Sequence, residues 1–203
     1  MEEIKETLMD IVDIYSERWN YLKQYIPDLD YNKINTDYRD LNNIVGHQQR
    51  AFAIYWAIKE YERTGGIGLE PGCGQAISPY CIGTDFYSGS NHPQYGGAYW
   101  PHVRCLGEML PFKNESFGFI ISHHSLNCMA RHAFKEWLRV LKRGGRMVIV
   151  IPDKKYDPEN SSYITYYSAE EFKNILGQIL DVKIIEYDTL HNNFSFNIVI
   201  EKL

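Results

Sequence analysis

The sequence predicts an α/β protein with a mostly parallel sheet, an antiparallel last strand and a helical segment before the sheet. Beyond residue 66, short apolar runs alternate with turns and helical stretches, which is the pattern of strands joined by crossovers. Before that point, apolar residues recur at the three- and four-residue steps of amphipathic helices. The last two apolar runs are separated only by residues 188–193, which are too few for a crossover, so we expect an antiparallel pair.

The composition limits the class of protein. A chain of 203 residues with 44% hydrophobic and 23% charged residues suits one domain with its own core rather than two enzymatic domains. Its 21 basic and 26 acidic residues give a net charge of −5, which argues against a nucleic-acid partner. Aromatic residues reach 14%, and this excess needs an explanation.

The cysteines and the apolar runs predict the compartment. The four cysteines show neither a CxxC pair nor zinc-ribbon spacing, so we expect reduced thiols and no metal site. No apolar run approaches the roughly 18 residues of a membrane span, and the N-terminal stretch is acidic rather than leader-like. We therefore expect a cytoplasmic protein without membrane contact, and we predict no particular oligomeric state.

The N-terminal part predicts two helices. Residues 1–25 have an amphipathic period that ends before Pro27, and residues 27–45 have no clean period and are interpreted as a loop. A second helix is expected over residues 47–62, stopped by the two glycines at 65 and 66. We assign residues 1–64 to a helical cover, as part of the same domain, and residues 65–203 to the α/β domain.

The α/β part predicts seven strands and two helices. One helix contains Phe134 and Trp137 and is closed by glycines 144 and 145, and the other follows a capping box from Ser168 to Glu171. The expected strands cover residues 66–70, 81–85, 102–106, 117–122, 146–151, 182–187 and 194–200.

The first chemically informative site is the sequence LEPGCGQA at residues 69–76. Gly72 and Gly74 follow an apolar strand, where backbone amides without side chains can approach a ligand closely. Asp85 ends the next strand, and an acid at that place can accept both hydroxyls of a ribose. Taken alone, this glycine pair is equally compatible with an ordinary tight turn.

Two later segments, EMLPFKNESFGFIIS at residues 108–122 and FKEWLRVLKRGGRMVIVIPD at residues 134–153, carry a family resemblance. With the glycine pair and Asp85, their order and spacing resemble the class I S-adenosylmethionine-dependent methyltransferases, especially compact members with an abbreviated first crossover. The resemblance covers residues 66–203. It implies a Rossmann-like methyltransferase fold, S-adenosylmethionine as cofactor and methyl transfer as activity.

The resemblance also implies a set of cofactor-binding residues. Gly72 and Gly74 would meet the methionine half of the cofactor, Asp85 the ribose hydroxyls and Phe86 the adenine. The backbone of residues 107–109 would face the adenine edge. The complete set is Glu70, Pro71, Gly72, Cys73, Gly74, Asp85, Phe86, Gly107, Glu108, Met109, Ser122 and His123. Within it, Ser122 and His123 would line the sulfonium side, and Glu70 would either orient the loop or meet the cofactor's ammonium group.

The sequence departs from the family pattern at several points. The third small position of the loop is Ala76 instead of a glycine, and Leu106 replaces the family's acid before the LPF turn. The change at Leu106 bears on the recognition of adenine. Gly118 and Arg143 are changes at scaffold positions. Only residues 71–80 separate the first two strands, and Pro79 lies among them, so we expect a turn instead of a first crossover helix.

The loop over residues 87–101 replaces a second family helix and takes up part of the aromatic excess. Tyr87, Tyr95, Tyr99 and Trp100 can wall a cofactor or acceptor pocket, or they can cover a core that the missing helix leaves open. We favour the second interpretation, because the loop replaces a packing element and its aromatic residues must first shield the sheet.

Two consecutive histidines are the candidate catalytic residues. His123 and His124 end the fourth strand, and either can deprotonate an acceptor near neutral pH. Strand alternation predicts that their side chains point to opposite faces, so at most one serves as the general base. Two ordinary strand-end residues are the alternative.

Three functions follow from these observations. The first is a methyltransferase acting on an acceptor that is expected to be a small molecule. The second is a non-catalytic S-adenosylmethionine-binding or regulatory module of the same fold, suggested by Leu106, Ala76 and the missing helices. A nicotinamide-dependent oxidoreductase ranks last, because it needs a third glycine and a helix start after Gly74, and residues 77–79 supply neither.

Overall fold

The computed structural model describes residues 41–74, 77–88, 101–154, 164–165, 167–190 and 195–203. The chain divides into two compact units, Met1–Tyr55 and Trp56–Leu203. Of the first unit, the structure describes only the beginning of helix α3 (Leu41–Thr64). The second unit contains the rest of α3 and the sheet, and the predicted helix over residues 1–25 lies outside the described residues.

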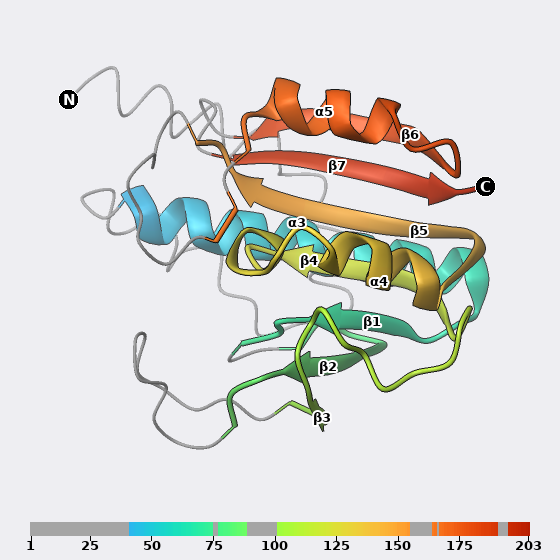
Figure 1. The fold of residues 1–203 in the computed structure, drawn as a ribbon. Coiled ribbons are helices and arrows are strands. Elements are labelled where there is room, and N and C mark those ends of the chain that lie inside the picture. Colours follow the sequence, from blue (N-terminus) through green and yellow to red (C-terminus); the bar gives the residue numbers. More distant parts are fainter. Residues whose placement is uncertain (1–40, 75–76, 89–100, 155–163, 166, 191–194) are drawn as a thin grey trace. The chain divides into compact units, whose positions relative to one another are not determined.

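Seven strands form one mixed sheet in the order β3-β2-β1-β4-β5-β7-β6 (Figure 1). Neighbouring strands from β3 to β5 are parallel, and β7 is antiparallel to both β5 and β6. The strands are β1 (Gly68–Pro71), β2 (Cys81–Asp85), β3 (Val103–Arg104), β4 (Phe117–His123), β5 (Leu141–Pro152), β6 (Val182–Leu190) and β7 (Ser195–Lys202). The predicted α/β class, with its antiparallel last strand, is confirmed.

Two helices, α4 (Ala133–Val140) and α5 (Ala169–Gly177), cover one face of the sheet. Trp137 of α4 and Phe172 of α5 are buried in one core cluster with the apolar side chains of β4, β5 and β7. The predicted capping box at the start of α5 is present, since Ser168 and Glu171 each accept the other's backbone N–H. This reciprocal pair satisfies two amides that the first helical turn leaves without partners.

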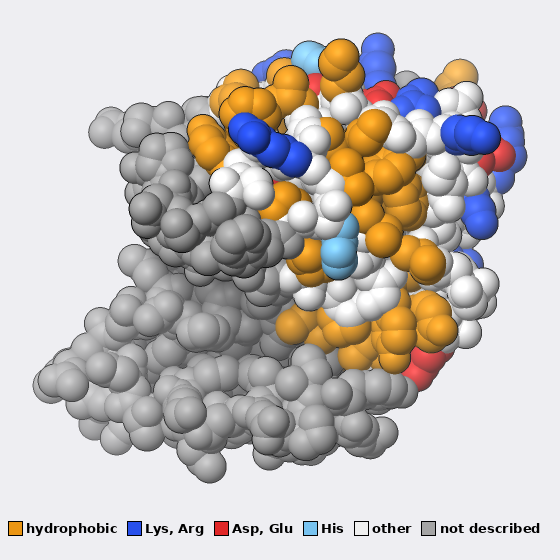
Figure 2. Space-filling view, turned by 90° about the horizontal axis from the view of Figure 1, so that it is seen from below, with side chains coloured by type: hydrophobic (Ala, Val, Ile, Leu, Met, Phe, Trp, Pro, Cys, Tyr) orange, Lys and Arg blue, Asp and Glu red, His pale blue; other side chains and the backbone are white. Residues whose placement is uncertain are grey.

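The edge of the sheet at β3 carries exposed apolar side chains. Figure 2 views the molecule from this side and shows hydrophobic side chains over much of the described surface. Phe86 after β2 is 49% exposed, and Met109 after β3 is 69% exposed. These two side chains present apolar surface just after the ends of β2 and β3.

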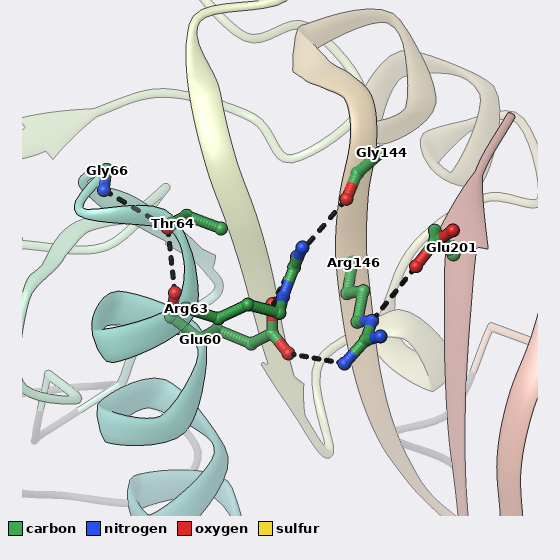
Figure 3. Close-up of polar contacts among 7 residues, drawn as sticks. All are labelled: Glu60, Arg63, Thr64, Gly66, Gly144, Arg146 and Glu201. Carbon is green, nitrogen blue, oxygen red and sulfur yellow. Dashed lines mark hydrogen bonds and ion pairs between the residues drawn. The ribbon is translucent and has the colours of Figure 1, made fainter.

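A buried carboxylate near the C-terminus of α3 joins this helix to β5 (Figure 3). Glu60 is 1% exposed and accepts hydrogen bonds from Arg63 of its own helix and from Arg146 of β5. Arg146 also donates to Glu201 of β7, and Arg63 donates to the carbonyl of Gly144. One carboxylate thus fixes the last turns of α3 against two strands.

Several predicted boundaries were wrong. Residues 41–45 were expected in a loop but are helical, because α3 continues through Gly46, a residue that a helix tolerates at a cost of about 1 kcal/mol. The predicted stop of this helix is confirmed at Gly65, whose φ of +62° and N–H bond to the carbonyl of Tyr61 form a helix C-terminus. The strand predicted over residues 102–106 shrinks to Val103–Arg104.

The glycines at 144 and 145 do not close helix α4. The helix ends at Val140, and the chain continues at once as β5, where Phe117 pairs with Leu141 and Phe119 with Arg146. Residues 142–145 therefore form a bulge inside the strand, and Gly144 has a φ of +68°. A glycine pair has the same freedom in a bulge as after a helix, so the sequence pattern did not distinguish the two.

Candidate functional site

The glycine-rich loop begins where β1 ends. Gly72 and Gly74 have φ values of +65° and +61°, a region that side-chain-bearing residues rarely adopt. Between them, Cys73 donates its backbone N–H to the carbonyl of Thr84 in β2 at 3.0 Å. The two predicted glycines therefore shape a tight loop that is attached to the neighbouring strand.

Asp85, at the end of β2, is joined directly to this loop. Its Oδ2 accepts the N–H of Gly74 at 3.0 Å, and its Oδ1 accepts the N–H of Tyr87 at 3.0 Å. A carboxylate offers about four acceptor positions, so two backbone bonds leave capacity for two further donors. The structure thus brings together the glycine pair and the acid that the sequence predicted as one site.

Glu70 and Pro71 lie buried below the loop. The Glu70 carboxylate is 1% exposed, and its Oε2 accepts the backbone N–H of Ser78. It therefore holds the connection between β1 and β2, which is the first of the two roles predicted for it. No helix occurs in the described residues of that connection, residues 72–74 and 77–80, as its length predicted.

Phe86 follows Asp85 and exposes half of its surface. The Arg104 guanidinium lies 5.6 Å from the centre of the Phe86 ring, and its Nε donates to the Phe86 carbonyl at 2.8 Å. Tyr87 meets Phe86 edge to face, with ring centroids 5.3 Å apart. Of the aromatic loop, Tyr87 is described, whereas Tyr95, Tyr99 and Trp100 lie outside the described residues.

The turn after β3 is held by contacts from helix α4 and from the segment before it. The carbonyl of Gly107 accepts the indole N–H of Trp137 at 2.9 Å, and Glu108 Oε1 accepts the backbone N–H of Ala130 at 2.9 Å. Glu108 is therefore committed to the protein's own backbone, while the neighbouring Leu106 and Met109 side chains are exposed. The turn that was predicted to face adenine is thus anchored by two hydrogen bonds and has an apolar rim.

The two histidines at the end of β4 do not point to opposite faces. Their rings stack, with centroids 4.6 Å apart and planes at 15°. The predicted alternation was wrong because His124 has a φ of +53°, which ends the strand geometry at His123. Just before them, Ser122 is buried, and its hydroxyl bonds to Ser125 Oγ at 3.0 Å.

His124 differs from His123 in its chemistry. Burial of the His124 ring lowers its pKa to about 4, although the residue as a whole keeps some solvent exposure. Its Nε2 lies 3.3 Å from Ser195 Oγ at the start of β7. At pH 7 the ring is therefore neutral, and it makes a structural contact between β4 and β7.

Sequence reasoning missed the segment after β4, which contains the short helix η1 (Leu126–Cys128). A side-chain atom added to Gly72 would lie 2.6 Å from Ser125 Cβ and 3.0 Å from Met129 Cε. One added to Gly107 would lie 2.3 Å from Met129 Sδ. No spacing rule in the sequence marks this segment, because its role depends on two loops that come from other strands.

Two cysteines complete the surroundings of Asp85. Burial, with a smaller contribution from the Asp85 charge, raises the pKa of Cys128 to about 11. Burial also raises the pKa of Cys105, with a lesser effect from the same carboxylate. All four cysteines are free thiols, and these two are protonated at neutral pH and are weak nucleophiles.

Within the described residues, no group of three or more His, Cys, Asp and Glu side chains is arranged to hold a metal ion. Among the helices that the structure describes, none is both long and apolar enough to cross a membrane.

Comparisons with known proteins concern the fold rather than single site residues. A family model described as a methyltransferase domain matches residues 90–149. The chain has the fold of the S-adenosylmethionine-dependent methyltransferases, as the solved structures described next show. The predicted resemblance is confirmed, and the family match supports an enzyme of the methyltransferase class with S-adenosylmethionine as its cofactor.

Solved structures show the same fold at low sequence identity. The YcgJ protein of Bacillus subtilis is 22% identical, with a TM-score of 0.52, over 68% of this chain and 72% of its own. An S-adenosylmethionine-dependent methyltransferase of Mesorhizobium loti is 14% identical, with a TM-score of 0.55, over 74% and 98%. A Haloferax volcanii protein in complex with the Trm112 methyltransferase activator is 14% identical, with a TM-score of 0.52, over 74% and 97%. No curated protein matches the sequence significantly.

Proposed function

We propose that the protein is a cytoplasmic methyltransferase that transfers the methyl group of S-adenosylmethionine to a small-molecule acceptor. The observation that carries the proposal is the hydrogen bond from Gly74 N–H to Asp85 Oδ2. The sequence assigned these two residues to different parts of one cofactor, and this bond joins them at the carboxyl ends of neighbouring parallel strands. Ligands bind at that place in open α/β sheets.

The residues present fit the cofactor. Asp85 keeps acceptor capacity for the two ribose hydroxyls, and the side chain of Cys73, the residue between Gly72 and Gly74, is buried. Phe86 and Met109 offer exposed apolar surface for adenine. The cofactor supplies an electrophilic methyl carbon on a sulfonium, so no covalent protein nucleophile is required. The chain's own task is to position the reactants and to exclude water.

Of the two candidate bases, His123 suits the task better. A general base works best with a pKa near the working pH, whereas the pKa of His124 is lowered to about 4. His124 also has its Nε2 near Ser195. The His123 ring stacks on this neutral His124 ring, with centroids 4.6 Å apart. We assign His123 as the base and His124 as its support.

The acceptor class follows from charge. The net charge of −5 provides no broad basic surface for a nucleic acid, so the proposed acceptor is a small molecule. The test uses the full chain with methyl-labelled S-adenosylmethionine and a panel of small hydroxyl, amine and thiol compounds. Label transfer that is lost in His123→Ala but kept in His132→Ala, a variant outside the site, supports the proposal.

The second candidate is a non-catalytic binding module of the same fold. It is favoured by Leu106, which stands at the family's acidic position and is 47% exposed without a polar group to offer. A protein that binds S-adenosylhomocysteine but transfers label to no compound in the panel would favour this module. Transfer to any panel member excludes it.

A further inference from the structure

Met129 lies between the two loops that are proposed to hold opposite halves of the cofactor. Its Cε is 3.0 Å from the position of a side-chain atom added to Gly72. The same Cε is 2.5 Å, and its Sδ 2.3 Å, from the equivalent position on Gly107. Distances below 3.0 Å are too short for real atoms, so the Met129 thioether occupies the space beside Gly107 and touches the space beside Gly72.

The backbone that carries Met129 is held on several sides. Ala130 donates its N–H to Glu108, and the Met129 carbonyl accepts the hydroxyl of Thr165 at 3.3 Å. Met129 N–H donates to the carbonyl of Leu126 at 3.2 Å, which closes the η1 turn. These three hydrogen bonds hold the backbone from which the Met129 side chain extends toward the two loops.

We infer that Met129 is a positioning residue that sets the spacing between the Gly72 loop and the Gly107 turn for the cofactor. This inference rests on the proposed function. A long, unbranched thioether reaches both loops and adapts to their shape, whereas the single methyl group of an alanine reaches neither the Sδ nor the Cε position of Met129. The absence of side chains at Gly72 and Gly107 then serves the protein's own Met129, in addition to any ligand.

The first test compares three variants by calorimetric titration of the full chain with S-adenosylhomocysteine. Met129→Ala is expected to weaken binding about tenfold, because each loop loses its spacer. Met129→Leu, which keeps the apolar character and an atom at the position of Met129 Sδ, stays within about threefold of the wild type. Met147→Ala is the matched control, since Met147 is buried in the core and its loss lowers the melting temperature without changing the dissociation constant of the folded protein.

The second test is a double-mutant cycle with Gly107→Ala. In the wild-type background the added methyl group meets Met129 and weakens S-adenosylhomocysteine binding about tenfold. In the Met129→Ala background the space beside Gly107 is vacant. Gly107→Ala then weakens S-adenosylhomocysteine binding by less than a further threefold. Non-additivity of this size identifies direct coupling between the two positions.

The outcomes separate this inference from the proposed function. If wild-type protein binds S-adenosylhomocysteine while Met129→Ala binds it equally well, or if the cycle is additive, the positioning role is wrong. If wild-type protein does not bind at millimolar ligand, the proposed function itself fails. In that case the melting temperatures of the same four proteins, measured without ligand, still report whether Met129 couples to Gly107.

Discussion

At the scale of single residues, backbone conformation decides what the site can be. Gly72 and Gly74 have positive φ values in the connection that leaves β1 and runs back over residues 72–80 to the start of the parallel strand β2. His124 has a φ of +53° without being a glycine, and histidine is among the residues that tolerate this region. Strain of this kind gathers at functional sites, where surrounding contacts hold it in place.

Gly72→Ala should lower the free energy of unfolding by about 2 kcal/mol. The positive φ alone costs roughly 1–2 kcal/mol, and the added methyl group also meets Ser125 Cβ. Gly177→Ala is the control, because Gly177 lies in α5 with no atom within 4 Å of the added group. That helical change should stabilise the protein by about 0.5–1 kcal/mol. Equal effects of the two substitutions in urea denaturation would contradict this account.

His124 predicts a pH dependence of stability. Its folded pKa of about 4 lies below the ordinary 6.5, so between these values the unfolded state binds more protons. Its contribution is fully present above pH 6.5 and is lost as the pH falls towards 4, by about 1–3 kcal/mol. His124→Asn keeps a residue that tolerates positive φ. Its midpoint of urea unfolding should change less with pH between pH 4 and 6.5 than that of the wild type. An unchanged slope would show that other groups cause the loss.

At the scale of elements, sequence patterns predicted strand cores better than strand ends. The bounds of β2 are those predicted, because a turn and Asp85 delimit a short apolar run. The strand β5 was predicted too short, because its bulge at residues 142–145 has the same glycines as a helix end. The segment from Ser125 to Ala130 had no signal, since its contacts with Gly72, Gly107 and Glu108 exist only after the strands assemble.

The attachment of α3 to the sheet gives an element-scale prediction. Glu60→Gln should lower the free energy of unfolding by about 2–3 kcal/mol, because Arg63 and Arg146 lose the buried carboxylate that they share. Glu62→Gln is the matched control, since Glu62 forms an exposed pair with Lys59 that should contribute less than about 0.5 kcal/mol. Chemical denaturation of both variants checks this, and a Glu60→Gln protein as stable as the control would contradict the role.

At the scale of the whole molecule, the strand order decides where chemistry can occur. The sheet places the ends of β1, β2 and β4 side by side, and these ends carry the glycine pair, Asp85 and His123. The sequence predicted this arrangement through its resemblance to a family, because motif order along the chain reflects strand order. It did not predict which side chains the protein uses for its own contacts, such as Glu108 and Ser122.

The most direct test of this account is calorimetric titration of the full chain with S-adenosylhomocysteine. We expect saturable one-to-one binding that becomes 10- to 100-fold weaker in Asp85→Asn, because hydrogen bonds to a charged acceptor contribute about 1.5–3 kcal/mol. Asp181→Asn, at an exposed position outside the site, should bind like the wild type. No binding to the wild type at millimolar ligand, or equal binding by the Asp85→Asn variant, would contradict the assignment of the site.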